Sequence, residues 1–219
     1  MMKERLLSVI MHDLRSPMYS QSLLIDHLHE NYHKLSGPKL DELFYILKDS
    51  SNRIVQFSND FLLWYDSQRQ GFLIKTENIR LDNFMNETTV LYRNIAMRKG
   101  LYFDCDVPSG MVLSADRNML AIVIRNLVDN AVKYTSSGGI GISAGQENGH
   151  IRLMVKDTGR GMTASRIAEI TAFGEKDMYG PASTFGYRFI MELARKLNGD
   201  IDIQSEPGKG TVVQVRFKV

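Results

Sequence analysis

The chain has 219 residues, of which 43% are hydrophobic and 24% are charged, which is the composition of an ordinary globular protein. Global disorder and a collagen-like repeat are therefore excluded, and a disulfide framework is excluded because Cys105 is the single cysteine. The formal net charge is +2, with 27 Lys and Arg against 25 Asp and Glu, and there is no concentrated basic tract. We therefore expect no nucleic-acid partner.

The chain contains no apolar stretch that approaches the roughly 20 residues of a membrane-spanning helix. Its first residues lead directly into a helical pattern and lack the layout of a signal peptide. We expect a cytoplasmic location, with any membrane attachment through segments outside this sequence.

From residue 3 to about residue 68, apolar residues recur at spacings of three and four, as they do on one face of an α-helix. The pattern breaks at residues 36–38, Ser-Gly-Pro, where a helix stop precedes a proline suited to the first turn of the next helix. This predicts an all-α helical hairpin over residues 1–70. Because two helices alone bury little surface, a homodimeric four-helix bundle is the expected arrangement.

From about residue 72, strand-like runs alternate with helical periodicities, which predicts an α+β sandwich over residues 71–219 with a mixed sheet covered by helices on one face. The predicted strands lie near residues 72–75, 101–106, 139–145, 150–157, 199–205 and 211–218. The predicted helices lie near residues 81–98, 116–134, 163–172 and 186–198. The boundary between the two domains is expected in the polar stretch of residues 67–71.

The first candidate site is the string His-Asp-Leu-Arg-Ser-Pro at residues 12–17. His12 lies about 200° around the helix from Ile10 and Leu14, so the imidazole faces solvent if those two face the core. Asp13 can accept an N–H from one ring nitrogen and leave the other with a lone pair, as a nucleophile requires. Taken alone, such a histidine is far more often a solvated surface residue beside a helix bend, here at Pro17.

The complete string resembles the H box of two-component sensor histidine kinases, whose phosphorylated histidine heads a dimerising helical hairpin. The resemblance implies that His12 is the phosphoacceptor and that Asp13 orients and activates it. In that family the position four after the histidine is commonly Thr or Asn and is tied to phosphatase activity. Here it is Ser16, so the resemblance leaves phosphatase activity undecided.

The second candidate site is the string Asn-Leu-Val-Asp-Asn-Ala-Val-Lys-Tyr-Thr at residues 126–135. Asn126, Asn130 and Lys133 share one helix face, where carboxamide oxygens can coordinate Mg²⁺ and the ammonium can bind phosphate. Alone they are also typical of a solvated face. The string resembles the kinase N box, which implies an Mg–ATP site that includes these residues and Tyr134 in a Bergerat-type ATPase fold. Asp116 is expected to cap this helix.

The third candidate site is Asp157, which follows an apolar strand and precedes Gly159 and Gly161. The carboxylate can accept a hydrogen bond from an exocyclic amine, and the glycines allow a close approach of the backbone to a flat ligand. The pattern also suits any tight turn. Coming 27 positions after Asn130, it resembles the family's G1 box, in which the aspartate recognises adenine.

The glycine-rich lid of that family is only partly matched here. The corresponding residues, 182–187, retain Gly186 but carry Ala182 and Thr184 in place of glycines and Tyr187 in place of a leucine. Backbone amides bind phosphates best where glycine lets the chain come close, so we expect altered lid closure on ATP. The final Gly-x-Gly-Thr turn matches the family and implies that Thr211 lies near the nucleotide.

Together these resemblances imply a protein histidine kinase that uses ATP and Mg²⁺, autophosphorylates His12 and passes the phosphoryl group to an aspartate of a response regulator receiver domain. The alternative is a weakly active homologue with a degenerate lid, acting as a dimeric phosphorelay or scaffold module. His29 and His33 lie one helical turn apart and form at most half of a metal site, so a solvated face is the expected role for them.

Overall fold

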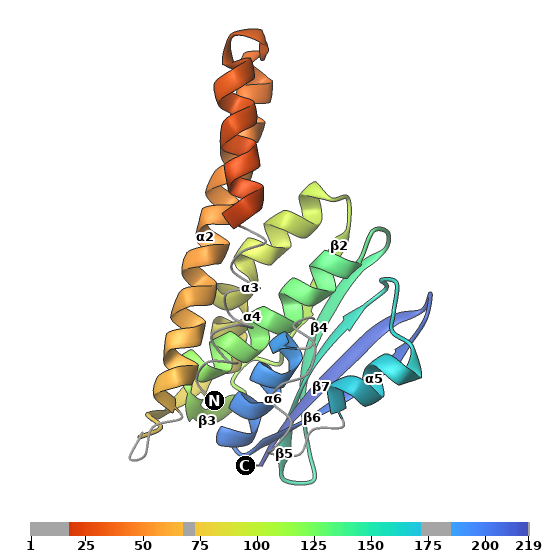
Figure 1. Ribbon diagram of the computed structural model, residues 1–219. Helices are drawn as coiled ribbons and strands as arrows, with labels where there is room; N and C mark the ends of the chain where they lie inside the picture. The colour runs from red at the N-terminus through yellow and green to blue at the C-terminus, as the bar shows by residue number, and fades with distance from the viewer. Residues whose placement is uncertain (1–17, 68–72, 172–184, 219) are drawn as a thin grey trace. The chain divides into compact units, whose positions relative to one another are not determined.

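The computed structural model describes residues 18–67, 73–171 and 185–218. These residues form two compact units, one of residues 18–67 and the other of residues 73–171 and 186–218 (Figure 1). Within the described residues, no helix combines the length and apolar character needed to cross a membrane. Each unit is described by itself below.

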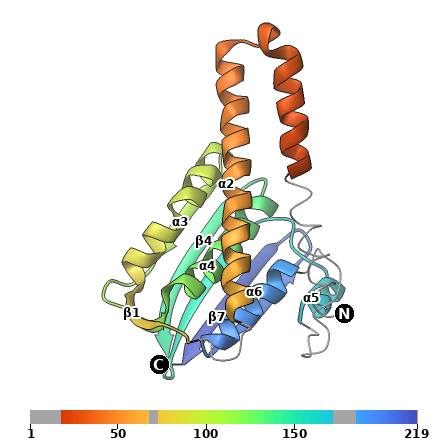
Figure 2. The same cartoon turned by 60° about the vertical axis from the view of Figure 1, so that its left-hand side comes forward.

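The first unit contains two helices that lie side by side (Figure 2). Residues 18–31 are helical, the 3₁₀ turn η1 covers Tyr32–Lys34, and α2 covers Gly37–Ser67. α2 therefore begins at the Gly-Pro break that the sequence predicts as a helix start. Gln21 Nε2 donates to Ser51 Oγ at 2.7 Å and to Leu47 O at 3.4 Å, which fixes an antiparallel register between the two helices.

The apolar side chains of this unit are mostly exposed. Leu28 and Leu43 are buried, at 8% and 7% exposure, but Phe44, Val55 and Leu62 are 52%, 59% and 54% exposed. The last three are spaced by 11 and 7 residues, both close to a whole number of helical turns, so they form one stripe along α2. A second copy of the helices would cover this stripe, but the dimeric bundle itself stays a prediction.

The second unit is built on a five-stranded sheet in the order β2-β4-β5-β7-β6, in which β2 and β4 are parallel and the other pairs are antiparallel. The prediction of a mixed sheet is therefore confirmed. The strands of this sheet are β2 Tyr102–Asp106, β4 Gly139–Glu147, β5 His150–Asp157, β6 Gly199–Glu206 and β7 Gly210–Lys218. A separate antiparallel pair is formed by β1 Thr76–Arg80 and β3 Val112–Asp116.

Helices α3, α4 and α6 cover one face of this sheet (Figure 1). The helices of the unit are α3 Leu81–Arg98, α4 Arg117–Tyr134, α5 Ala164–Thr171 and α6 Phe185–Lys196. Along β5, Ile151 and Leu153 are 1% exposed whereas Arg152 between them is exposed, as expected for a strand with one buried face. The core lies between this face and the apolar sides of α4 and α6.

α4 is anchored at both ends by side chains from other segments. Asp116 Oδ1 accepts from the backbone N–H groups of Asn118 and Met119 at 3.0 and 3.1 Å, which confirms the predicted cap. Its other oxygen accepts from the backbone N–H of Lys75 at 3.1 Å. At the other end, Lys99 Nζ donates to the carbonyl of Val132 at 2.6 Å, where the last helical carbonyls lack backbone partners.

The start of the second unit differs from the sequence prediction in two ways. The strand predicted near residues 72–75 lies instead at Thr76–Arg80, and β3 was not predicted. Leu73 is 81% exposed, whereas Ile79 and its register partner Leu113 are 1% and 3% exposed. β1 has one buried residue, so a run of apolar residues does not mark it, and the apolar run near residues 72–75 was not the strand.

Candidate functional site

The candidate site of the second unit lies where the C-terminal end of α4, the C-terminal end of β5 and the β6–β7 turn meet. Tyr134, the last residue of α4, accepts a hydrogen bond at its carbonyl from the backbone N–H of Arg160 at 3.2 Å. Arg160 in turn accepts at its carbonyl from the backbone N–H of Gly208 at 2.8 Å. The turn after β5 is therefore held between α4 and the β6–β7 turn.

Asp157 is 9% exposed and forms the floor of this junction. Its Oδ1 accepts from the backbone N–H groups of Gly159 at 2.8 Å and Thr211 at 3.2 Å. Burial raises the pKa of the Asp157 carboxyl above its ordinary value, and these two hydrogen bonds oppose the increase. Because both bonds are made to Oδ1, Oδ2 is the oxygen available in this geometry to accept from a ligand.

Two glycines allow this turn to pack closely. A Cβ on Gly159 would overlap the carbonyl oxygen of Tyr134. A Cβ on Gly161 would overlap the carbonyl oxygen of Glu206, and Gly161 also has a φ of +65°, which L side chains rarely adopt. The glycines of the predicted adenine string therefore perform a packing role that a side chain at either position would prevent.

A hydroxyl pair joins the β6–β7 turn to the same junction. Ser205 Oγ donates to the carbonyl of Gly210 at 2.8 Å, lies 3.0 Å from Thr211 Oγ1 and accepts from the backbone N–H of Met162 at 2.8 Å. Together with the bond from Thr211 N–H to Asp157, this brings Asp157, Gly159, Gly161 and Thr211 into one cluster, as the sequence strings imply.

Tyr134 forms an aromatic wall at the end of α4. Its side chain is 37% exposed, and the Arg160 guanidinium lies 4.5 Å from the ring centroid. Lys133 Nζ lies 5.3 Å from the same centroid. Both distances are within the range of cation–π attraction. One flat ring and two cations thus border the junction that Asp157 occupies.

Asn126 and Asn130 are half-buried on α4, one helical turn apart, with the exposed Lys133 on the same face. Asn126 Nδ2 donates to the carbonyl of Ile122 at 2.9 Å, which directs its amide nitrogen to its own helix, so Oδ1 is the acceptor atom that the side chain offers. Carboxamide oxygens are hard ligands of the kind that Mg²⁺ accepts. Among the described residues no group of three or more His, Cys, Asp or Glu side chains forms a metal site.

Several predicted residues cannot be placed. His12 and Asp13, the lid residues at positions 182 and 184, and Ser16 lie outside the described residues. Gly186 lies in the first turn of α6. Their predicted roles stay predictions.

The structure also adds residues to the site that the sequence did not identify. Arg160 packs on Tyr134, and Ser205 joins the β6–β7 turn to the turn after β5. Arg160 lies between Gly159 and Gly161 of the adenine string, which marks it as a neighbour of the predicted site. This was the available signal. A single serine before a turn gives none.

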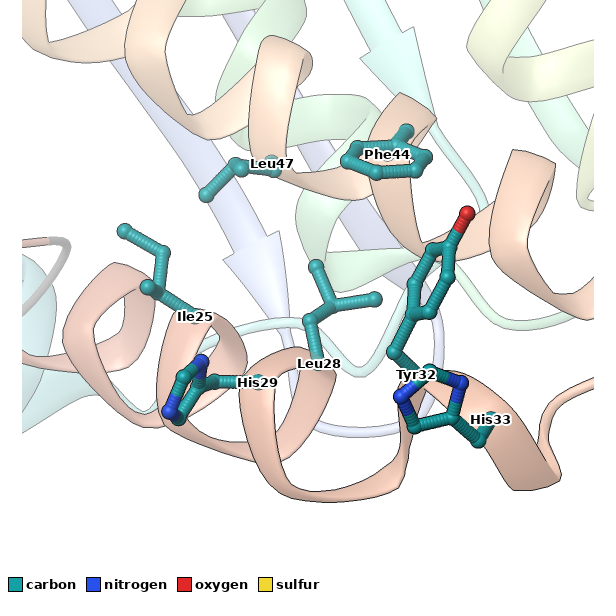
Figure 3. A pocket seen from close by; sticks show the side chains of 7 residues that line it. All are labelled: Ile25, Leu28, His29, Tyr32, His33, Phe44 and Leu47. Carbon is teal, nitrogen blue, oxygen red and sulfur yellow. The ribbon is translucent and has the colours of Figure 1, made fainter.

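The first unit contains a separate hollow of about 460 Å³ between its two helices (Figure 3). Ile25, Leu28, Phe44 and Leu47 line it together with Tyr32, and His29 and His33 lie at its rim. Both histidines are exposed. The expectation of a solvated face fits this exposure, although both side chains also border apolar surface.

Residues 115–219 match the family described as histidine kinase-, DNA gyrase B- and HSP90-like ATPases. Over 226 aligned residues the chain is 27% identical to the sensor histidine kinase RcsC of Escherichia coli (strain K12). The alignment covers 98% of this chain and 23% of RcsC. The chain thus spans about a quarter of the length of this curated relative.

Two solved structures share the fold. The Acinetobacter baumannii histidine kinase AdeS matches with a TM-score of 0.67 at 18% identity, over 94% of this chain and 97% of that structure. Full-length ShkA in complex with AMPPNP matches with a TM-score of 0.63 at 20% identity, over 94% of this chain and 45% of that one. The mixed sheet with its helices is therefore consistent with a Bergerat-type ATPase fold.

Proposed function

We propose, from the premise that this chain carries the catalytic core of a two-component sensor histidine kinase, that its second unit binds Mg–ATP and donates the γ-phosphoryl group to His12. The observation that carries the proposal is the junction at Asp157. A buried carboxylate with one oxygen fixed by two backbone donors begins a turn that is hydrogen-bonded to the carbonyl of Tyr134, the last residue of α4. One face of that helix carries two carboxamides and an ammonium.

The residues present fit an adenine nucleotide. Asp157 Oδ2 accepts from the exocyclic amine of adenine, and the bonds from Gly159 and Thr211 to Oδ1 hold the carboxylate in one orientation. A base with a carbonyl at that place would set two acceptors against each other, so the carboxylate discriminates in favour of adenine. The exposed face of Tyr134 supplies a stacking surface of the kind a base needs.

The phosphate end is held by α4. Asn130, with Asn126, would hold Mg²⁺ through amide oxygens, and Lys133 neutralises phosphate charge. When bound, Mg²⁺ supplies electrostatic stabilisation of the charge that develops on the phosphate oxygens. Catalysis then consists mainly of positioning and charge neutralisation.

In the transfer, a ring nitrogen of His12 attacks the γ-phosphorus, a P–N bond forms, and the bond from phosphorus to the β–γ bridging oxygen breaks to release ADP. Asp13 accepts the N–H of the other ring nitrogen and stabilises the imidazolium that forms. In the second step a carboxylate oxygen of an aspartate on a receiver domain attacks the same phosphorus, and the P–N bond breaks. The imidazole is thereby regenerated.

The partners follow from this chemistry and from the surface of the first unit. The exposed stripe of Phe44, Val55 and Leu62 on α2 supports a homodimer through the helices. A response regulator receiver domain supplies the acceptor aspartate. We place the protein in the cytoplasm, where ATP and such a receiver domain are both present.

The proposal is tested by incubating the chain with γ-labelled ATP and Mg²⁺ and recovering the labelled protein. We expect label that is lost in acid, stable in alkali and located on His12. Label that is acid-stable, or located on another residue, would contradict the proposed acceptor. Failure of the chain to bind any adenine nucleotide by calorimetry would contradict the proposed role of the second unit.

A further inference from the structure

Arg160 is an exposed residue of the turn after β5 whose backbone is hydrogen-bonded on both sides. Its N–H donates to the carbonyl of Tyr134 at 3.2 Å, and its carbonyl accepts from the N–H of Gly208 at 2.8 Å. A Cβ on either neighbour, Gly159 or Gly161, would overlap a backbone carbonyl oxygen, so the turn is closely packed on each side of Arg160. The backbone of Arg160 is therefore fixed relative to the last residue of α4.

The side chain of Arg160 packs on the ring of that same residue. The guanidinium carbon lies 4.5 Å from the ring centroid of Tyr134, within the range of cation–π attraction and guanidinium stacking. In the part of the chain that the structure describes, no carboxylate forms an ion pair with this guanidinium. The ring is thus the contact that orients the Arg160 side chain, and the same contact restricts the ring.

Tyr134 keeps surface for a ligand despite this contact. The guanidinium covers one face of the ring, and the residue is still 37% exposed. Lys133 Nζ lies farther from the centroid, at 5.3 Å, at the end of a flexible stem that can follow a phosphate group away from the ring. The face turned away from Arg160 is therefore the one on which a flat base can stack.

We propose that Arg160 is a positioning residue of the nucleotide site, which holds the Tyr134 ring in the orientation that stacks on the base. The inference rests on the ATP-binding role proposed above and adds to it a residue that acts through Tyr134. An exposed ring at the end of a helix otherwise turns about its side-chain bonds, and ordering it on binding costs entropy. A ring that is fixed before the nucleotide arrives lowers that cost and so raises the affinity.

The first experiment measures the affinities of adenosine, ADP and ATP for the full chain by calorimetry in the wild type, Arg160→Gln and Arg160→Lys. We expect Arg160→Gln to weaken all three ligands by the same factor, about two- to fivefold, as for the loss of an exposed cation–π contact. Arg160→Lys should recover part of the loss, because it keeps the cation. Arg152→Gln is the matched control, since Arg152 is an exposed arginine of β5 and its replacement changes the charge equally.

The direction of the change and its dependence on the ligand exclude other roles for Arg160. If the nucleotide had to displace the guanidinium from the ring, Arg160→Gln would tighten binding. If Arg160 bound phosphate groups directly, the variant would weaken ADP and ATP but leave adenosine unchanged. Either result, or affinities equal to those of the wild type, would overturn the inference.

A double-mutant cycle tests whether the effect passes through the ring. In a Tyr134→Leu background, Arg160→Gln should change the three affinities no further, because the ring that Arg160 positions is absent. A merely structural role of Arg160 would weaken binding by the same factor in both backgrounds, and that result would overturn the inference.

The same measurements separate the inference from the proposed function. If the wild type binds none of the three ligands, both are contradicted. If the wild type binds them and Tyr134→Leu weakens them while Arg160→Gln does not, only the role of Arg160 is contradicted.

A second measurement reports on the ring itself. The chain has nine tyrosines, and incorporation of 3-fluorotyrosine gives each a ¹⁹F resonance, of which Tyr134→Phe identifies that of Tyr134. We expect Arg160→Gln to shift this resonance in the absence of ligand, Arg152→Gln to leave it in place, and ADP to shift it in the wild type. A Tyr134 resonance that Arg160→Gln does not move would show that the guanidinium does not hold the ring in solution, and would overturn the inference.

Discussion

The two units differ in how completely each covers its own apolar surface. In the second unit Val123, Ile124 and Ile140 are 0% exposed, between a sheet face and the helices over it. In the first unit Phe44 and Val55 remain 52% and 59% exposed along α2. The unit that contains the proposed substrate site buries a core within one chain, whereas the exposed apolar stripe of α2 is the surface that the proposed dimeric bundle would cover.

The difference extends to the site chemistry. The proposed donor site is assembled from α4, β5 and the β6–β7 turn of the second unit. The proposed acceptor, His12, belongs in the sequence to the predicted helical hairpin of residues 1–70. Binding of nucleotide and acceptance of phosphoryl should therefore be separable by mutation, which gives the comparison its sharpest test.

The largest expected effect is that of His12→Gln, which removes the nucleophilic ring nitrogen. We expect autophosphorylation to fall below detection, at least a thousandfold, while ADP affinity stays within twofold, because no residue of the second unit is changed. His27→Gln, at an exposed histidine of the same helical unit, is the matched control. Wild-type labelling of the His12 variant would show that another residue is the acceptor.

Asp157→Asn should give the next largest effect, and it acts on the opposite unit. Replacing the fixed carboxylate leaves the adenine amine without its charged acceptor. The binding free energies of ADP and ATP should weaken by about 1–3 kcal/mol, so both dissociation constants should rise roughly 5–150-fold. Labelling should fall only as far as ATP occupancy falls, so saturating ATP should restore it. Equal ATP affinity in variant and wild type would refute the adenine-binding role.

The pH dependence provides a further check on Asp157. Since burial raises the pKa of this carboxyl, it protonates at a higher pH than an ordinary aspartate as the solution is acidified. Nucleotide affinity of the wild type should therefore decline at a higher pH than an ordinary aspartate would give, and the variant should lack that decline. The sign for stability is opposite: the raised pKa favours the folded protein in acid, and this contribution is lost as the pH rises through the folded-state pKa.

The sequence predicted best the helices, whose apolar residues recur at regular spacings. The apolar periodicity of residues 117–134 and 81–98 identified α4 and α3 to within a residue, because each helix buries one continuous stripe. β1 was misplaced because Ile79 is its one buried residue, and β3 was missed because its buried residues include the small Ala115 and the polar Asp116 besides Leu113. Arg160 and Ser205 were not identified as site residues because their roles depend on neighbours distant in sequence.

The predicted homodimer provides a test of the exposed apolar surface of the first unit. Val55→Asn places a polar group in the exposed stripe of α2, and we expect the dissociation constant of the dimer to rise about tenfold, from the lost apolar burial on two chains. Glu42→Ala is the control, because Glu42 lies on the opposite side of α2 and makes only an exposed ion pair with Lys39. Light scattering across a dilution series measures both. A monomeric wild type at tens of micromolar would contradict the homodimer.

The smallest expected effect concerns the phosphate end of the second unit. Ala182 and Thr184 stand where the resembling family has glycines, and both lie outside the described residues. Glycine lets backbone amides come closest to phosphate oxygens and lets the chain adopt positive φ. The double change Ala182→Gly and Thr184→Gly should therefore raise ATP affinity or the rate of autophosphorylation a few-fold.

The selectivity of that gain matters more than its size. Asp157 is proposed to act on the base, which ADP and ATP share, so a change there should affect the two nucleotides equally. The glycine changes should favour ATP over ADP, because they alter only the part of the site proposed to contact the triphosphate. Calorimetry with both nucleotides, followed by a labelling time course, measures the two quantities. An equal gain for ADP and ATP, or none in affinity or rate, would show that this segment contacts the triphosphate by some arrangement other than a glycine-rich lid.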